Sequence, residues 1–285
     1  MEAEKIVFVT GATGRQGSAA AMYLSQAGFQ VRALTRNPGS RKAESLKEFD
    51  IEVVKGDLNV VDSYRNYLKD AHGLFSVQTY ENGIKRELDQ GLALARVAKE
   101  EGIKHFVYSS VILVDLHEGV PHLQTKFEIE NFIRSSGIPF TILRPASFFE
   151  NFLIPQVKKG IHKGKLVQPM EQNTVLQYVS VVDIGKAVAQ VFHGAEKYHG
   201  KIIPVASEQL TTQQVAERFS QVLQKPVKYE KLPSLIARLV LGKSVYAMFK
   251  KLDKENLFKQ NTETFRPQFN NMLSLEDWIR LHFEE

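Results

Sequence analysis

The chain has 285 residues, of which 43% are hydrophobic and 24% charged, enough to bury a core and typical of a globular protein. It contains no cysteine, which excludes disulfides, thiolate metal sites and cysteine nucleophiles. The net charge of +5 is modest, and no zinc-finger, helix-turn-helix or RNA-binding signature accompanies it, so we do not expect direct nucleic-acid binding.

The sequence also argues against a membrane protein. No apolar run approaches the roughly 18 residues that a membrane-spanning helix needs. The first five residues, MEAEK, are mixed in charge, and the apolar run behind them is too short for the core of a signal peptide. We therefore expect a cytoplasmic protein without a membrane or metal site.

Short runs rich in Val, Ile, Phe and Leu alternate with helical patterns through the first two-thirds of the chain. Strands are predicted at 5–10, 30–35, 51–55, 73–77, 105–109 and 140–143. Helices are predicted between them at 18–27, 62–69 and 87–101, two of which end before Gly28 and Gly102. This alternation predicts an α/β fold, a Rossmann-type doubly wound parallel sheet.

The pattern changes after Pro145, where prolines and glycines interrupt short segments. Residues 178–183 are predicted to be a strand that turns into a helix capped by Asp183, and 201–205 a further strand; 211–214 is typical of a helix start. We therefore predict one domain from residues 1–145 and about 177–207. A smaller, mostly helical domain would comprise about 146–176 and 208–285.

A glycine-rich loop follows the first predicted strand. Residues 10–17 read TGATGRQG, and glycines at this position let the backbone approach a pyrophosphate at a helix N-terminus. A glycine triplet alone is a weak signal, but its place between a strand and a helix makes it strong. The residues predicted to hold the dinucleotide are Gly11, Thr13, Gly14, Arg15, Gln16 and Gly17.

The end of the second strand indicates which dinucleotide is bound. An NAD site places Asp or Glu about 20 residues beyond the loop, but here the nearest downstream acid is Glu44. Arg36 stands where a 2′-phosphate would lie, and its guanidinium suits phosphate oxygens. Arg15, with Arg41 or Lys42, could add further charge. The alternative is that Arg36 is a solvated residue; the sequence favours NADP(H).

The chain resembles the NmrA-like family of atypical short-chain dehydrogenase/reductases over nearly its whole length. The motifs that carry the resemblance are TGATGRQG at 10–17, VRALTRNP at 31–38, KGDL at 55–58, GIKHFVYSS at 102–110, RPASFFENF at 144–152 and YVSVVDIG at 178–185. The resemblance implies a bilobed protein with a cofactor cleft. It also implies that Asp57 and Leu58 border the adenine, and that Gln78 and Thr79 line the floor near the nicotinamide.

Two residues after the sixth strand, Phe149 and Asn151, lie in the loop that would face the nicotinamide. An aromatic cluster at a cleft suits a flat substrate, although such clusters more often form core at a domain interface. The segment 234–252 is amphipathic and basic, and is interpreted as a lid, a dimer surface or a partner-binding helix.

The expected catalytic pair is incomplete. In the wider superfamily that the chain resembles, a Tyr acts as acid and a Lys four residues later binds the cofactor ribose. Lys126 occupies the Lys position, but the Tyr position is His122. His122 could donate a proton or could simply cap a helix. Ser109 or Ser110, at the end of the fifth strand, could bond a substrate oxygen, and Ser110 is the third catalytic candidate.

The leading hypothesis is an NADPH-dependent reductase of a quinone-like or conjugated small molecule, because hydride transfer to an electron-poor ring needs chiefly orientation. The alternative is a non-catalytic NADP(H) sensor that acts through a regulatory protein partner. The sequence does not choose between a monomer and a homodimer.

Overall fold

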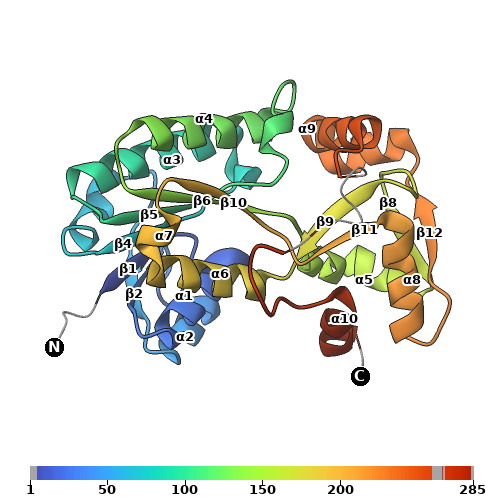
Figure 1. Cartoon of the computed structure of the whole chain (residues 1–285), viewed down its shortest axis with the longest axis horizontal. Helices are drawn as coiled ribbons and strands as arrows, with labels where there is room; N and C mark the ends of the chain where they lie inside the picture. Colours follow the sequence, from blue (N-terminus) through green and yellow to red (C-terminus); the bar gives the residue numbers. More distant parts are fainter. Residues whose placement is uncertain (1–4, 259–264, 266, 284–285) are drawn as a thin grey trace. The chain divides into compact units, whose positions relative to one another are not determined.

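The computed structural model describes residues 5–258, 265 and 267–283 (Figure 1). Residues 1–4, which contributed to the argument against a signal peptide, and the last two residues of the predicted second domain lie outside this range. Among the helices of the described residues, none is both long enough and apolar enough to cross a bilayer.

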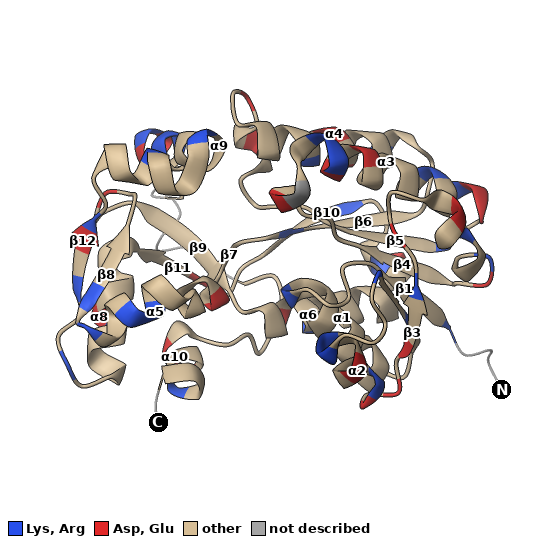
Figure 2. Ribbon diagram, turned by 180° about the vertical axis from the view of Figure 1, so that it is seen from behind, with Lys and Arg blue, Asp and Glu red and all other residues tan. Residues whose placement is uncertain are grey.

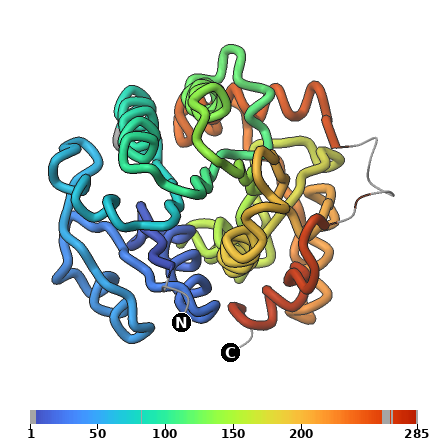
Figure 3. Tube along the Cα trace, turned by 60° about the vertical axis from the view of Figure 1, so that its left-hand side comes forward, coloured from blue at the N-terminus to red at the C-terminus, as the bar shows by residue number. Residues whose placement is uncertain are grey.

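The chain forms two compact units. Unit 1 comprises Met1–Val114, Leu123–Arg144 and Val181–Pro204, and unit 2 comprises Asp115–His122, Pro145–Ser180 and Val205–Glu285. The chain therefore leaves unit 1 and returns to it. Figure 3 shows the return, since the yellow helix α6 (Val181–His193) lies beside the blue helix α1 (Arg15–Gln26).

Unit 1 is built on a seven-stranded sheet in the order β10-β6-β5-β4-β1-β2-β3. Its strands are β1 (Ile6–Val9), β2 (Gln30–Thr35), β3 (Glu52–Lys55), β4 (Gly73–Ser76), β5 (His105–Ser109), β6 (Phe140–Pro145) and β10 (Lys201–Val205). The pairs from β3 through β6 are parallel. The α/β Rossmann-type prediction is therefore confirmed.

Helices cover both faces of this sheet (Figure 1). Besides α1 and α6, unit 1 holds α2 (Arg41–Lys47), α3 (Ile84–Glu100), most of α4 (Pro121–Ser135) and α7 (Ala195–Tyr198). The helices α3 and α4 bury one face with residues such as Leu94 and Ile129 against Phe106 and Tyr108, while α1 and α6 pack on the other. Most charged residues lie on helices and loops (Figure 2).

The structure confirms two predicted helix ends and replaces one predicted helix with two short turns. Gly28 and Gly102 adopt positive φ after α1 and α3, as a C-terminal glycine should. The predicted helix at 62–69 is instead two 3₁₀ turns, η1 (Val61–Ser63) and η2 (Arg65–Tyr67). The Ser63 hydroxyl donates to the Val60 carbonyl and accepts from the Asp57 amide, which competes with helical backbone bonding.

A second correction concerns Asp183. Because α6 begins at Val181, Asp183 is its third residue rather than its cap. Further along the chain the predicted start at 211–214 is confirmed, since Thr211 and Gln214 form a capping box at the start of α8 (Thr212–Val222).

Unit 2 contains two small sheets, β11-β9-β7 and β12-β8. Its strands are β7 (Ser147–Phe148), β8 (Lys165–Gln168), β9 (Val175–Val179), β11 (Glu208–Thr211) and β12 (Lys228–Lys231). Its helices, with α8, are α5 (Pro155–His162), α9 (Ser234–Glu255) and α10 (Leu275–Phe283). The remaining 3₁₀ turns among the described residues are η3 (Tyr80–Asn82), η4 (Val114–Leu116) and η5 (Phe149–Leu153).

Candidate functional site

The sheet order places a natural binding position between β1 and β4. Strand order reverses there, and ligands of open α/β sheets bind outside the carboxyl ends of the strands at such a point. Thr10, buried at the end of β1, holds the two strand ends together. Its amide donates to the Phe75 carbonyl at 3.0 Å, and its Oγ1 accepts from the Val77 amide at 2.9 Å.

The glycine loop begins directly after Thr10. Gly11 has φ +59°, and a Cβ there would lie 2.8 Å from a Val77 methyl. A Cβ on Gly17 would lie 2.2 Å from the Gly11 carbonyl oxygen, far inside contact distance. Glycine at both positions is therefore required by the turn and by the close packing of α1 against the loop.

The N-terminus of α1 is open to an anion. Gly14 is its N-cap, so no side chain caps the helix, and its first turn contains no acid. The first N–H groups of a helix have no partner within the helix and carry the positive end of its dipole. An anionic group at this end would satisfy both.

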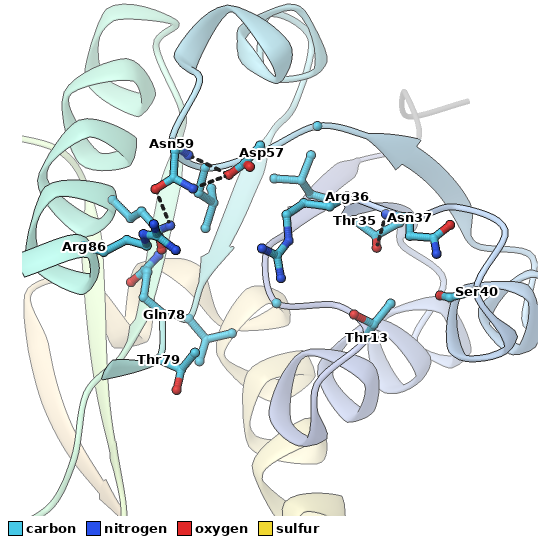
Figure 4. A pocket seen from close by; sticks show the side chains of 16 residues that line it. Thr13, Thr35, Arg36, Asn37, Ser40, Asp57, Asn59, Gln78, Thr79 and Arg86 are labelled. Atoms are coloured by element: carbon cyan, nitrogen blue, oxygen red, sulfur yellow. Dashed lines mark hydrogen bonds between the residues drawn. The ribbon is translucent and has the colours of Figure 1, made fainter. Parts of the chain in front are cut away.

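A pocket of about 280 Å³ opens beside the loop (Figure 4). It is formed by the carboxyl ends of β1 to β4 together with α3. Seven of the sequence-predicted cofactor residues line it: Gly11, Thr13, Arg36, Asp57, Leu58, Gln78 and Thr79. The other predicted loop residues, Gly14, Arg15, Gln16 and Gly17, belong to the turn and first turn of α1 rather than to the pocket wall.

Arg36 follows β2 and points its guanidinium into the pocket (Figure 4). Its side chain is exposed, and within the described residues it makes no ion pair. Neither Arg41 nor Lys42 lines the pocket. The cation missed by sequence reasoning is Arg86, which enters the pocket from α3.

The acidic residue of the pocket is engaged by a neighbour. Asp57 Oδ1 accepts from the backbone amide of Asn59 at 2.9 Å and from its Nδ2 at 2.6 Å. Asn59 Oδ1 in turn accepts from Gln90 Nε2 of α3 at 2.9 Å. These contacts join the loop after β3 to α3 and fix one wall of the pocket. Sequence reasoning missed Asn59 and Gln90, which no motif identifies.

Lys126 lies on the buried face of α4, with Ile129 and Ile133 fully buried. Its Nζ lies 3.0 Å from Oε1 of Glu87, whose side chain is fully buried. Glu87 Oε2 also accepts from Thr125 at 2.5 Å. The structure therefore gives Lys126 a carboxylate partner that the sequence analysis did not include.

Three hydroxyl groups lie at the end of β5 or directly after it, and each has different surroundings. Tyr108 is fully buried below Lys126, whose Nζ lies 5.8 Å from its ring centre. Burial, with the carboxylates of Glu87 and Glu130, raises the pKa of Tyr108 well above its usual range, which makes its phenol a weaker proton donor. Ser109 donates to Gln16 at 2.7 Å.

Ser110 is the third hydroxyl. It is 4% exposed, and its Oγ has no hydrogen-bond partner among the described residues. A buried hydroxyl without a partner is costly, so Ser110 remains available to bind a ligand oxygen.

His122 is buried at the second position of α4, where its Nδ1 lies 2.7 Å from the Ser244 hydroxyl of α9. This contact within unit 2 favours a structural role, the alternative already open at the sequence level. It joins the start of α4 to α9, the segment interpreted above as a lid, dimer surface or partner helix.

The loop after β6 contains two of the predicted cofactor residues, Phe149 and Asn151. Phe149 is fully buried, and its ring stacks on that of Tyr178 with 6.2 Å between the ring centroids. The ring centroid of Trp278 lies 5.6 Å away from that of Phe149. The Phe149 side chain therefore forms the aromatic core of unit 2, because a large ring gains more from such burial than from solvent contact. Asn151, two residues on, is exposed.

Comparison with known proteins identifies the kind of chain that carries this site. A model of the NmrA-like family matches residues 3–279. An NmrA-like family domain-containing protein of Dictyostelium discoideum is 30% identical over 241 residues, which cover 79% of this chain and 80% of that protein.

Two solved structures show the same fold. A negative transcriptional regulator, NmrA, in complex with NAD has a TM-score of 0.80 at 23% identity and covers 98% of this chain and 95% of its own. The NADPH-dependent quinone oxidoreductase QOR2 of Escherichia coli, complexed with NADPH, has a TM-score of 0.78 at 23% identity, with 97% and 99% covered. At this identity the likeness speaks for the fold alone.

Proposed function

The chain belongs to the NmrA-like family, and from that premise we propose that it is an NADPH-dependent reductase of a quinone-like or similarly conjugated small molecule. The observation that carries the cofactor assignment is the pocket beside the glycine loop. It combines an uncapped helix N-terminus with Arg36 at the end of β2, where an NAD site would have an acid.

The residues present fit a phosphorylated dinucleotide. Gly11 and Gly17 allow a tight turn in which a Cβ would collide with neighbouring atoms, and the α1 N-terminus offers N–H groups to a pyrophosphate. Arg36 would bind the 2′-phosphate, with Asp57 and Leu58 beside the adenine and Gln78 and Thr79 toward the nicotinamide. A homologous fold that holds NADPH in the Escherichia coli quinone oxidoreductase supports this cofactor.

Two residues of this chain, Lys126 and Ser110, could bind a substrate oxygen during the reaction. Bound nicotinamide supplies a hydride. Lys126 forms an ion pair with Glu87, and we propose that its ammonium group orients the ribose or a substrate oxygen from the end of the sheet. Ser110 offers a buried hydroxyl to the same oxygen. Because quinone reduction needs chiefly orientation, the loss of the superfamily's Tyr is tolerated, and solvent supplies the proton.

The second candidate function is a non-catalytic NADP(H) sensor that acts through a protein partner. Two contacts favour it: Lys126 is paired with a buried carboxylate and His122 with Ser244, so neither side chain stands alone as an acid or base. The fold is also that of a transcriptional regulator.

We propose that the two domains predicted from the sequence bind different ligands. The domain of 1–145 and about 177–207 would bind NADP(H), and that of about 146–176 and 208–285 would bind the substrate or the partner.

Turnover separates the two functions. Purified protein is mixed with NADPH and a panel of quinones, and the absorbance of NADPH is followed. The reductase proposal predicts turnover with at least one acceptor. Tight and unequal binding of NADPH and NADP⁺ without turnover of any acceptor would instead support the sensor.

The role of Lys126 needs a variant that does not leave Glu87 as an unpaired buried charge. The double variant Lys126→Met/Glu87→Gln removes both charges together. We expect it to bind NADPH and to lose at least about tenfold in kcat. An unchanged kcat would restrict Lys126 to a structural role.

A further inference from the structure

Two arginines face the same pocket from different elements (Figure 4). Arg36 reaches it from the end of β2, and Arg86 from the first turn of α3. They are far apart in sequence, so only the fold brings them to one cavity. Sequence patterns after β2 identify the first, whereas nothing around Arg86 marks it as a ligand residue.

Neither arginine has an acidic partner within the described residues. Other cations of unit 1 do: Arg32 pairs with Glu52 and Asp70, and Lys85 with Asp89. The carboxylate of the pocket, Asp57, accepts two hydrogen bonds from Asn59 instead. Two guanidinium groups beside one cavity outweigh the single carboxylate of Asp57, and this net positive charge attracts an anion.

The orientation of α3 is set by the pocket wall. Gln90 lies four residues after Arg86, so the two side chains share one face of the helix. Gln90 donates to Asn59 at 2.9 Å, and Asn59 donates to Asp57 at 2.6 Å. This chain of contacts holds that face of α3 toward the pocket and with it the base of the Arg86 side chain.

We propose that Arg86 is a second specificity-determining residue, which binds the 2′-phosphate of NADP(H) together with Arg36. The inference rests on the proposed function, because it assumes a dinucleotide in this pocket. A phosphate carries about two negative charges and three acceptor oxygens, more than one guanidinium fork satisfies. Donors from β2 and from α3 would grip it from two directions.

The test uses fragments that contain only this half of the cofactor. Adenosine 2′,5′-bisphosphate and 5′-AMP differ by the single phosphate at the 2′ position. Calorimetric titration compares wild type, Arg86→Gln and the matched control Lys85→Gln. Lys85 carries the same charge one residue away, is highly exposed, pairs with Asp89 and does not line the pocket.

We expect Arg86→Gln to weaken binding of the 2′,5′-bisphosphate about tenfold or more and to leave 5′-AMP unchanged. Lys85→Gln should change neither. Arg86 is exposed, so the variant should melt at the wild-type temperature. In Arg36→Gln/Arg86→Gln the losses should not add, because both residues bind one group.

Three results would overturn the inference. Equal losses for both fragments would mean that Arg86 contacts the adenosine rather than the phosphate, and no loss would mean that it binds neither. If adenosine 3′,5′-bisphosphate bound as tightly and lost as much in Arg86→Gln, the pair would not select the 2′ position. The proposed function fails differently: wild type itself would bind neither NADPH nor the 2′,5′-bisphosphate.

Discussion

Three residues of the glycine loop each have a separate structural role that explains the residue type. Thr10 joins the ends of β1 and β4 through hydrogen bonds to Phe75 and Val77. Gly11 turns the chain with positive φ, and Gly17 lets α1 pack against the Gly11 carbonyl. The loop is thus a close packing of backbone on backbone that leaves the helix N–H groups available to a ligand.

Gly17→Ala tests that packing. The new methyl would lie 2.2 Å from a backbone oxygen, so either α1 or the loop must move. We expect the free energy of unfolding to fall by about 1–3 kcal/mol and NADPH binding to weaken at least tenfold, measured by urea denaturation and titration. The control is Gly39→Ala, where the nearest atom is 3.8 Å away; equal effects in both variants would contradict the account.

The sequence predicts residues that follow shortly after a strand, such as Gly11 after β1 and Arg36 after β2. It does not predict Arg86, because its place in the pocket depends on how α3 packs against the loop after β3. The sequence also does not predict which ring packs on Phe149, because Trp278 comes from far along the chain.

At the scale of elements, a buried pair joins α3 to α4. The spacing of Lys126, Ile129 and Ile133 puts these residues on one face of α4, and the Lys126 side chain is only 12% exposed. The partner of Lys126 could not be predicted, because Glu87 lies on another helix. A single glutamate in a helical pattern is normally expected to face solvent. The fully buried Glu87 makes this pair an energetic link between the two helices.

A double-mutant cycle measures that link. Glu87→Gln and Lys126→Met should each lower the free energy of unfolding by about 3 kcal/mol, since each leaves an uncompensated buried charge. The double variant should lose clearly less than the sum. Additive losses in urea denaturation would mean that the two charges do not interact.

At the scale of the molecule, all seven strands in the sheet of unit 1 are predicted from the sequence, six of them before position 145 and β10 at 201–205, because buried parallel strands form continuous apolar runs. The return of the chain at Val181 depends on contacts between α6 and α1. A Cβ on Gly185 of α6 would lie 2.7 Å from the Ala19 carbonyl oxygen of α1, a proximity that no local pattern encodes.

The sheet also contains a buried titratable group. His105 of β5 is 2% exposed, and its Nε2 lies 2.9 Å from Thr141 Oγ1. Because Thr141 donates its only hydroxyl proton to the Tyr198 carbonyl, the histidine Nε2–H is the donor to Thr141. Burial, with nearby His199 and His72, lowers the pKa of His105 to about 4, so the neutral ring is the folded form.

This predicts a pH dependence of stability. Between about pH 6.5 and 4 the unfolded chain binds a proton at His105 that the folded chain does not, so stability falls as pH falls through this window. We expect a loss of about 2 kcal/mol between pH 7 and 5 from this residue. His105→Gln, which keeps a donor toward Thr141, should flatten the urea-denaturation profile; an unchanged slope would contradict the assignment.

Titration of NADPH and NADH into wild type and Arg36→Glu tests the central claim most directly, that the pocket beside the glycine loop selects NADP(H). We expect wild type to bind NADPH at least about tenfold more tightly than NADH. Arg36→Glu should lose this preference, mostly by weaker binding of NADPH. Equal affinities in wild type, or equal losses for both nucleotides in the variant, would contradict it.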